Sequence, residues 1–251
     1  MSKIKVAMCQ IFVLDGDRAG NFVRIEDAIR QAKDAGAKIV CLPETVILGW
    51  VNPDAHKRAY PIPGKDSERL CKLAKKYEVY LCAGLEEKDG RNLYDSAILT
   101  NDKGQILAKH RKINVMPELM TPPYAAGNEV SAVQTRFGKI GILICADTHK
   151  DKILERMAGL KPDLLLVPYG YAAPENNWPG HGKQLQKVVV KTARKIGAPV
   201  VGTNLVGQIT NGPWRGRVYG GQSIAADKNG KIIAVCNDRD RDIRIITVNT
   251  G

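Results

Sequence analysis

The sequence lacks the features that mark membrane, secreted and zinc-binding proteins. No apolar run approaches the roughly 18 residues that a membrane span needs, and residues 1–6 lack the apolar core of a secretory signal. The six cysteines form no Cys-x-x-Cys pair and the four histidines are scattered, so the spacing of a zinc site is absent. We therefore expect a cytoplasmic protein without a membrane span or metal site, in which most cysteines are buried, reduced thiols.

Acidic residues are too few to balance the basic ones. The chain has 38 Lys and Arg residues against 26 Asp and Glu residues, which gives a formal net charge of +12. Such a charge raises the possibility of a nucleic-acid partner. However, the basic residues are spread along the whole chain, without a dense run and without interleaved aromatic residues. We therefore favour a solvated basic surface, which can also steer an anionic substrate.

Apolar residues recur with the spacing of alternating strands and helices, and the series occurs twice. In each half, two amphipathic helices separate three strands, and a hairpin follows. No linker rich in proline, glycine or serine divides the chain. We predict an α/β fold with two repeated halves, their sheets packed together and their helices outside, in a single domain of residues 1–251. The expected strands are 5–10, 38–42, 79–85, 93–100 and 105–109 in the first half, 139–145, 164–167, 199–204, 221–226 and 231–235 in the second, and a last strand at 243–248.

Three chemically capable residues follow directly after predicted strands. Glu44 comes after the strand at 38–42, Lys112 comes shortly after the strand at 105–109, and Cys145 ends the strand at 139–145. Strand ends are where α/β proteins hold ligand-binding groups. A thiol there can attack substrate, a carboxylate can take its proton, and an ammonium can stabilise developing negative charge.

Each of these residues alone is also typical of ordinary structure. A cysteine at a strand end is usually core packing, and a glutamate or lysine there is usually the first solvated residue. A cysteine–histidine pair is a competing site, although no histidine has a local catalytic signature. The histidines open to that role are His56, His110, His149 and His181.

The three residues also lie within longer motifs. Cys-Leu-Pro-Glu at 41–44, His-Arg-Lys-Ile at 110–113 and Gly-Ile-Leu-Ile-Cys-Ala-Asp at 141–147 occur in this order. With these motifs the chain resembles the nitrilase superfamily, the carbon–nitrogen hydrolases, over nearly its whole length. The resemblance implies the four-layer αββα sandwich of that family, with no cofactor. Supporting matches are Gly49-Trp50, Leu165-Leu166-Val167-Pro168, Asn204-Leu205-Val206-Gly207 and Gly221–Asp227.

The resemblance implies a role for each motif residue. Cys145 would attack a carbonyl or nitrile carbon and form a covalent thioester or thioimidate, with Glu44 as general base. Lys112 and the backbone N–H of Ala146 would stabilise the tetrahedral intermediate. Many members also carry a second glutamate after the lysine, and Glu118 is the best match.

If Glu118 does not take the position of that second glutamate, Glu129 is the alternative.

Family members that hydrolyse nitriles usually have Cys-Trp-Glu at the nucleophile, whereas this chain has Cys145-Ala146-Asp147. We therefore expect an amide or N-carbamoyl substrate, with a nitrile as the alternative. Acyl transfer to an acceptor other than water, and a non-catalytic basic binding protein that retains the fold, stay open. A homodimer or higher homo-oligomer is implied, and the expected pocket residues are Trp50, Tyr124, Tyr169, Tyr171 and Trp178.

Overall fold

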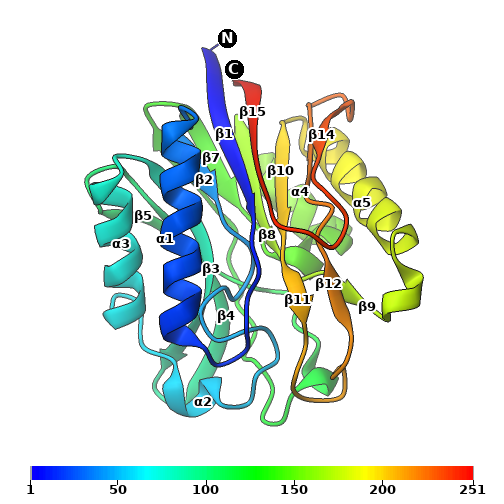
Figure 1. The fold of residues 1–251 in the computed structure, drawn as a ribbon. Coiled ribbons are helices and arrows are strands. Elements are labelled where there is room, and N and C mark those ends of the chain that lie inside the picture. Colours follow the sequence, from blue (N-terminus) through cyan, green and yellow to red (C-terminus); the bar gives the residue numbers. More distant parts are fainter. Residues whose placement is uncertain (1, 251) are drawn as a thin grey trace.

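The computed structural model describes residues 2–250, which form two six-stranded sheets and one small sheet (Figure 1). The first large sheet has the strand order β15-β1-β2-β3-β4-β5. Its strands β1, β2 and β3 are parallel, and the hairpin strands β4 and β5 follow antiparallel to them. The strands are β1 (Ser2–Gln10), β2 (Ile39–Cys41), β3 (Tyr80–Asp89), β4 (Asn92–Thr100), β5 (Ile106–Arg111) and β15 (Asp242–Thr250).

The second large sheet repeats this arrangement. Its order is β14-β13-β10-β8-β7-β6, with β7, β8 and β10 parallel and the hairpin of β13 and β14 beside β10. The two predicted β-α-β-α-β-β-β halves are therefore both present. The strands are β6 (Ser131–Thr135), β7 (Gly138–Ile142), β8 (Leu164–Tyr169), β10 (Val200–Asn204), β13 (Ile224–Ala226) and β14 (Ile232–Val235).

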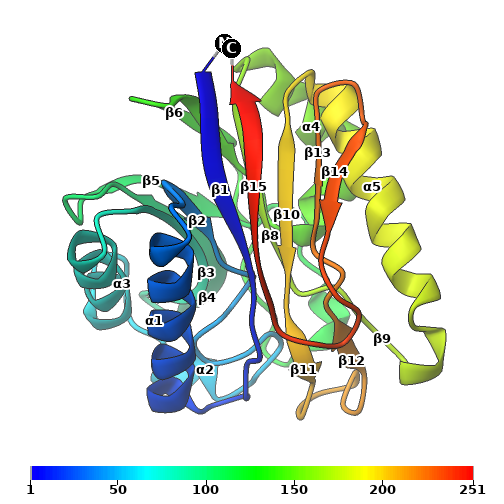
Figure 2. The ribbon, with the colours of Figure 1, turned by 45° about the horizontal axis from the view of Figure 1, so that its top comes forward.

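Helices cover the outer faces of both sheets. Helices α1 and α3 lie on the side of the first sheet, and α4 and α5 lie on the side of the second, in both views (Figures 1 and 2). This is the predicted four-layer αββα sandwich. The helices are α1 (Arg18–Asp34), α2 (Ala55–Arg58), α3 (Lys65–Lys76), α4 (Asp151–Gly159) and α5 (Gly180–Ile196), with short 3-10 turns η1 (Pro117–Leu119), η2 (Cys145–His149) and η3 (Glu175–Asn177).

Strand β1 shows why its sequence suits a middle layer. Successive side chains of a strand point to opposite faces. Val6 and Met8 belong to the core between the sheets, whereas Ala7 and Cys9 pack towards α1. Both sets are fully buried, so the strand reads as continuously apolar. Among residues 2–250, no helix is long and apolar enough to cross a membrane.

Several features differ from the sequence prediction, among them strand β6 and the short helix α2, neither of which was predicted. The last strand, β15, returns to the first half and pairs with β1 over nine residues, although it follows the second half in sequence. A small sheet of order β11-β12-β9 was not predicted, because its strands are only two or three residues long. Strand β7 ends at Ile142, and Cys145 opens the turn η2 instead of ending the strand. The small sheet comprises β9 (Ala172–Ala173), β11 (Val206–Gln208) and β12 (Val218–Gly220).

Candidate active site

Glu44 and Lys112 meet in the interior. Glu44 lies in the loop after β2 and is fully buried, and Lys112 follows β5 and is 2% exposed. The Lys112 Nζ donates a hydrogen bond to Glu44 Oε1. Two glycines make room for this carboxylate, because a Cβ at Gly84 would lie 2.5 Å from the Glu44 Cα, and one at Gly170 would lie 2.8 Å from Oε2. The sequence-predicted pair is therefore one contact.

A second carboxylate, Asp95, holds the same ammonium. Asp95 lies on β4 and is fully buried, and its Oδ2 accepts from Lys112 Nζ at 3.1 Å. Burial works against the charged Lys112, but the carboxylates of Glu44 and Asp95 outweigh it and raise its pKa well above the ordinary value. Lys112 is therefore an ammonium ion. The ring centroid of Trp50 lies 5.2 Å from its Nζ.

Cys145 is presented by a sharp turn beside this pair. It has a φ of +38°, in the left-handed region of backbone conformation that residues other than glycine rarely adopt. Burial and the Glu44 carboxylate raise the pKa of its thiol well above the ordinary value, while Lys112 and a hydrogen bond from the Gly170 backbone lower it. Since the raising effects dominate, the resting nucleophile is a thiol. We call Glu44, Asp95, Lys112 and Cys145 the buried cluster.

Asp147 ties the loop after Lys112 to the turn that carries Cys145. Its Oδ1 accepts from the backbone N–H groups of Ile113 at 2.9 Å and Asn114 at 2.8 Å. Its Oδ2 accepts from the Ile144 N–H at 3.1 Å and lies 2.8 Å from His110 Nε2. Burial alone would raise the pKa of Asp147, but these hydrogen bonds outweigh it and hold the pKa below the ordinary value. Asp147 therefore stays ionised and fixes the spacing of Lys112 and Cys145.

A cavity of about 370 Å³ opens above Cys145. This volume suits a small molecule. Its lining contains the cations Lys150 and Arg217 but no aspartate or glutamate. The Cζ of Arg217 lies 4.0 Å from the Trp214 ring centroid, and among residues 2–250 neither cation forms an ion pair. The lining residues are Trp50, Asn114, Met116, Cys145, Ala146, His149, Lys150, Gly170, Tyr171, Ala172, Ala173, Pro174, Asn177, His181, Trp214 and Arg217.

The aromatic residues proposed for the pocket divide into two groups. Trp50 and Tyr171 line the cavity, and Tyr171 stacks on His181 with ring centroids 4.2 Å apart. Tyr124, Tyr169 and Trp178 are buried behind the lining instead. The Tyr169 hydroxyl lies 3.0 Å from Thr148 Oγ1, and the Trp178 indole donates to the Val218 carbonyl at 3.2 Å.

Glu118 is not brought to the buried cluster. It lies on η1 with an exposed side chain, and Glu129 is exposed as well. The second carboxylate on Lys112 is Asp95, which sequence reasoning missed. The available signal was an acidic residue inside the otherwise apolar strand 92–100, where a carboxylate needs a partner.

The histidines do not replace Glu44 beside the thiol. His110 is bound to Asp147, and His149 and His181 line the cavity. The groups that act on the Cys145 thiol are Glu44, Lys112, the Gly170 backbone and Asp95. Among residues 2–250, no three histidine, cysteine or acidic side chains are grouped to hold a metal ion.

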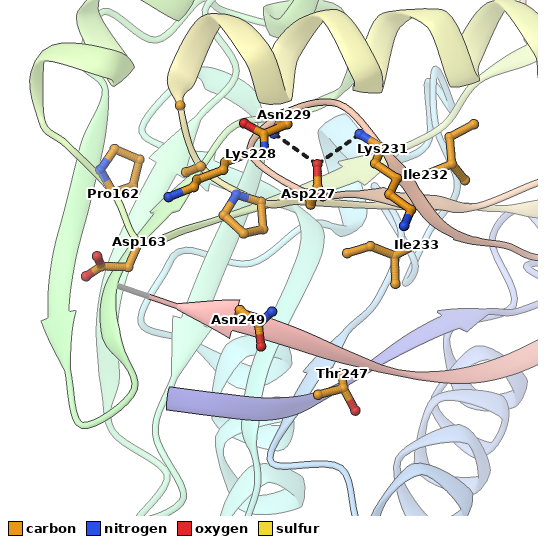
Figure 3. A pocket seen from close by; sticks show the side chains of 13 residues that line it. Pro162, Asp163, Asp227, Lys228, Asn229, Lys231, Ile232, Ile233, Thr247 and Asn249 are labelled. Carbon is orange, nitrogen blue, oxygen red and sulfur yellow. Dashed lines mark hydrogen bonds between the residues drawn. The ribbon is translucent and has the colours of Figure 1, made fainter. Parts of the chain in front are cut away.

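A second cavity, of about 590 Å³, lies at the opposite end of the second sheet (Figure 3). It is lined by segments that precede β8 and β10, whereas Cys145 and Gly170 follow the carboxyl ends of β7 and β8. Its polar side chains serve local structure. Asp227 accepts from the N–H groups of Asn229 and Lys231, both at 2.9 Å, and Asp163 accepts from Lys139 N at 2.7 Å. Its lining contains no cysteine or serine.

Two solved structures resemble the whole fold. The chain superimposes on the amidase from Nesterenkonia sp. AN1 in complex with acrylamide with a TM-score of 0.85, at 19% identity, covering 99% of this chain and 92% of that one. It superimposes on XC1258 from Xanthomonas campestris, a CN-hydrolase superfamily protein with an arsenic adduct in its active site, with a TM-score of 0.86 at 16% identity, covering 99% and 91%. These likenesses establish the fold.

Sequence comparison places the chain more closely. The omega-amidase NIT2 of Danio rerio is 28% identical over 200 residues, which cover 74% of this chain and 70% of that protein. Nitrilase 3 of Arabidopsis thaliana is 32% identical over 166 residues, covering 57% of this chain and 47% of that one. The carbon–nitrogen hydrolase family model matches residues 5–251. The chain therefore belongs to the carbon–nitrogen hydrolase family, the nitrilase superfamily.

Proposed function

We propose that the protein hydrolyses a small-molecule amide or N-carbamoyl compound through a covalent thioester on Cys145. The observation that carries this proposal is the buried cluster: Glu44 and Lys112 are in contact, and both act on the thiol that lines the cavity. A raised thiol pKa means that the nucleophile needs a base as it attacks, and Glu44 is the carboxylate beside it.

The proposed reaction runs in two halves. Glu44 takes the proton from Cys145 as Sγ bonds to the carbonyl carbon, and the oxyanion is stabilised by the Lys112 ammonium and the Ala146 N–H. The proton on Glu44 passes to the departing nitrogen, which leaves a thioester. Glu44 then takes a proton from water as its oxygen attacks the thioester, and that proton returns to Sγ when the acid leaves.

An amide is favoured over a nitrile. The relative covering most of this chain is named an omega-amidase, and the Nesterenkonia amidase has been solved with acrylamide and with butyramide. The residue after Cys145 is the small Ala146, whereas family members that hydrolyse nitriles usually have tryptophan at this position. The lining cations Lys150 and Arg217 further favour an amide whose far end carries a carboxylate. A nitrile substrate is the second candidate, because a nitrilase of Arabidopsis thaliana is 32% identical.

The test is ammonia release from a panel of aliphatic amides, half-amides of dicarboxylic acids, N-carbamoyl amino acids and nitriles. We expect turnover of an amide or N-carbamoyl class that Cys145→Ala abolishes, while the variant still unfolds cooperatively. Turnover of nitriles alone would select the second candidate. Turnover that survives in Cys145→Ala would overturn the nucleophile assignment.

We also propose one domain over residues 1–251, a homodimer or higher homo-oligomer, and a cytoplasmic location. All six cysteines, which lie within residues 2–250, are free thiols. Sedimentation velocity tests the oligomer, and a monomer at micromolar concentration would contradict it. Salt-dependent retention of DNA would instead favour a binding role for the basic surface.

A further inference from the structure

Asp95 touches Lys112 through both its backbone and its side chain. The Asp95 carbonyl accepts from the Lys112 backbone N–H at 2.8 Å, and Oδ2 accepts from Nζ at 3.1 Å. The antiparallel register of β4 and β5 explains this. Ser96 pairs with Arg111, so Asp95, which precedes Ser96, lies opposite Lys112, which follows Arg111. A single β4 residue therefore fixes both ends of Lys112.

The two carboxyl groups on Lys112 are left with unused oxygens. Among the described residues, Asp95 Oδ1 and Glu44 Oε2 are buried without a hydrogen-bond partner. Two ionised carboxylates and one ammonium would leave a net negative charge in the interior, which is costly. One proton on the pair removes that charge. The Lys112 ammonium lies closer to Glu44 than to Asp95, so Glu44 is the better stabilised as an anion. Burial and the Glu44 carboxylate also raise the pKa of Asp95 well above the ordinary value, and we therefore assign the proton to Asp95.

We propose that Asp95 is a positioning residue for the reaction, and that in its protonated form it anchors Lys112 while leaving Glu44 as the proton acceptor. This inference rests on the proposed function. The proton on Asp95 stays in place through both halves of the reaction. The groups that face Asp95 are Glu44 from the loop after β2, Lys112 from the end of β5, Tyr124, and Cys145 from η2. Of these groups, only Glu44 also accepts a hydrogen bond from Lys112 Nζ.

Two substitutions separate this role from an ionised one. Asp95→Asn keeps an oxygen acceptor for Lys112 and mimics the neutral acid, so we expect kcat within about threefold of wild type between pH 6 and 8. Asp95→Ala removes the anchor, and we expect kcat to fall about 100-fold with little change in KM, as for a lost transition-state contact. If Asp95→Ala does not fold, Asp95→Ser takes its place as the truncated variant. Glu86→Gln is the matched control, because Glu86 is also buried, on the neighbouring strand β3, and does not contact Lys112.

A second measurement does not depend on turnover. The rate of Cys145 alkylation by iodoacetamide reports thiol ionisation, which the Lys112 ammonium favours. We expect the pH profile of alkylation in Asp95→Ala to move to higher pH, and that of Asp95→Asn to match wild type between pH 6 and 8. Loss of activity in Asp95→Asn as large as in Asp95→Ala would overturn the neutral role, and full activity with an unmoved profile in the truncated variant would overturn any role. Failure of wild type to hydrolyse any amide would count against the proposed function alone, because alkylation would still distinguish the variants.

Discussion

In the buried cluster, the cation Lys112 lies against two carboxyl groups, whereas the cations Lys150 and Arg217 of the cavity lining form no ion pair among residues 2–250. We call the charge of Lys112 closed, because the carboxyl groups of Glu44 and Asp95 already contact its ammonium. We call the charges of Lys150 and Arg217 open, since water and substrate are left as their partners. In the proposed reaction, the balanced charge of the interior would serve the chemical step, and the unpaired charge along the lining would serve recognition of an anion.

The two histidines of the lining follow the same division. Burial and the nearby lysines Lys150 and Lys191 hold the pKa of His149 below its ordinary value. Burial and Arg217 do the same for His181, against a hydrogen bond with Gln184. Both rings are therefore neutral at pH 7, and the fixed positive charges of the lining are those of Lys150 and Arg217.

Removing the cation of the buried cluster breaks the comparison most severely. We expect Lys112→Met to lower kcat by about 10³-fold or more, because the oxyanion loses its charged donor. It should also destabilise the fold by about 3–5 kcal/mol near pH 7, since the carboxyl groups of Glu44 and Asp95 would remain buried without their cation. Single-turnover amide hydrolysis and urea unfolding measure the two effects.

Lys150→Met is the matched control for that experiment. It removes a lysine that lines the cavity above Cys145, is exposed, and forms no ion pair among residues 2–250. We expect its unfolding midpoint in urea to equal that of wild type. Equal loss of unfolding free energy in Lys112→Met and Lys150→Met would show that closed and open charges do not differ in their contribution to stability.

Arg217→Gln tests the open charge and gives the next largest effect. We expect KM for succinamate, which carries a carboxylate, to rise roughly tenfold, while the kinetics of the neutral butyramide stay unchanged. Added salt should reduce the wild-type preference for succinamate by screening. Arg215→Gln is the control, since Arg215 is exposed two residues away and does not line the cavity. Equal damage to both substrates, or an equal effect at Arg215, would rule out recognition of the carboxylate.

The sequence was sufficient to predict the layers because the periodicity of buried strands and amphipathic helices is local. Val6 to Cys9 read as a buried strand, and the two halves followed from that pattern. The pairing of β15 with β1 was beyond reach, because nothing local in residues 242–250 specifies a partner at the other end of the chain. The small sheet of β9, β11 and β12 was missed because such short strands have no readable period.

The site residues divide in the same way. Glu44, Lys112 and Cys145, which the structure brings together, could be predicted as candidates because each lies at or after a strand end and belongs to a motif. Asp95 was not found, because its partner Lys112 lies 17 residues away and only the register of β4 and β5 joins them. Glu118 was proposed from its distance along a loop after Lys112, and the path of a loop is not fixed by residue spacing. Its exposure on η1 is a property of tertiary structure.

Glu86 is a buried carboxyl group that forms no ion pair within residues 2–250, and it gives the smallest expected effect on activity. Its oxygens accept from the Leu48 backbone N–H at 3.2 and 3.3 Å, and burial raises its pKa to about 8. A carboxyl whose pKa is higher in the folded state holds its proton there while the unfolded chain has released it. The unfolding free energy of wild type should therefore fall between about pH 4.5 and 8 through this group, and level off above.

The Glu86→Gln substitution keeps an oxygen that accepts from the Leu48 backbone N–H, but the side chain no longer gains or loses a proton. We expect its unfolding free energy to exceed that of wild type by roughly 1–3 kcal/mol at pH 8 and by little at pH 5, with kcat unchanged at both. Urea unfolding at the two pH values measures the difference. A gain that is the same at pH 5 and pH 8 would mean that Glu86 does not titrate in this range. In that case, the interior would tolerate an ionised Glu86 without a cation beside it. The Lys112 ammonium would then not be the feature that distinguishes the buried cluster from the rest of the interior.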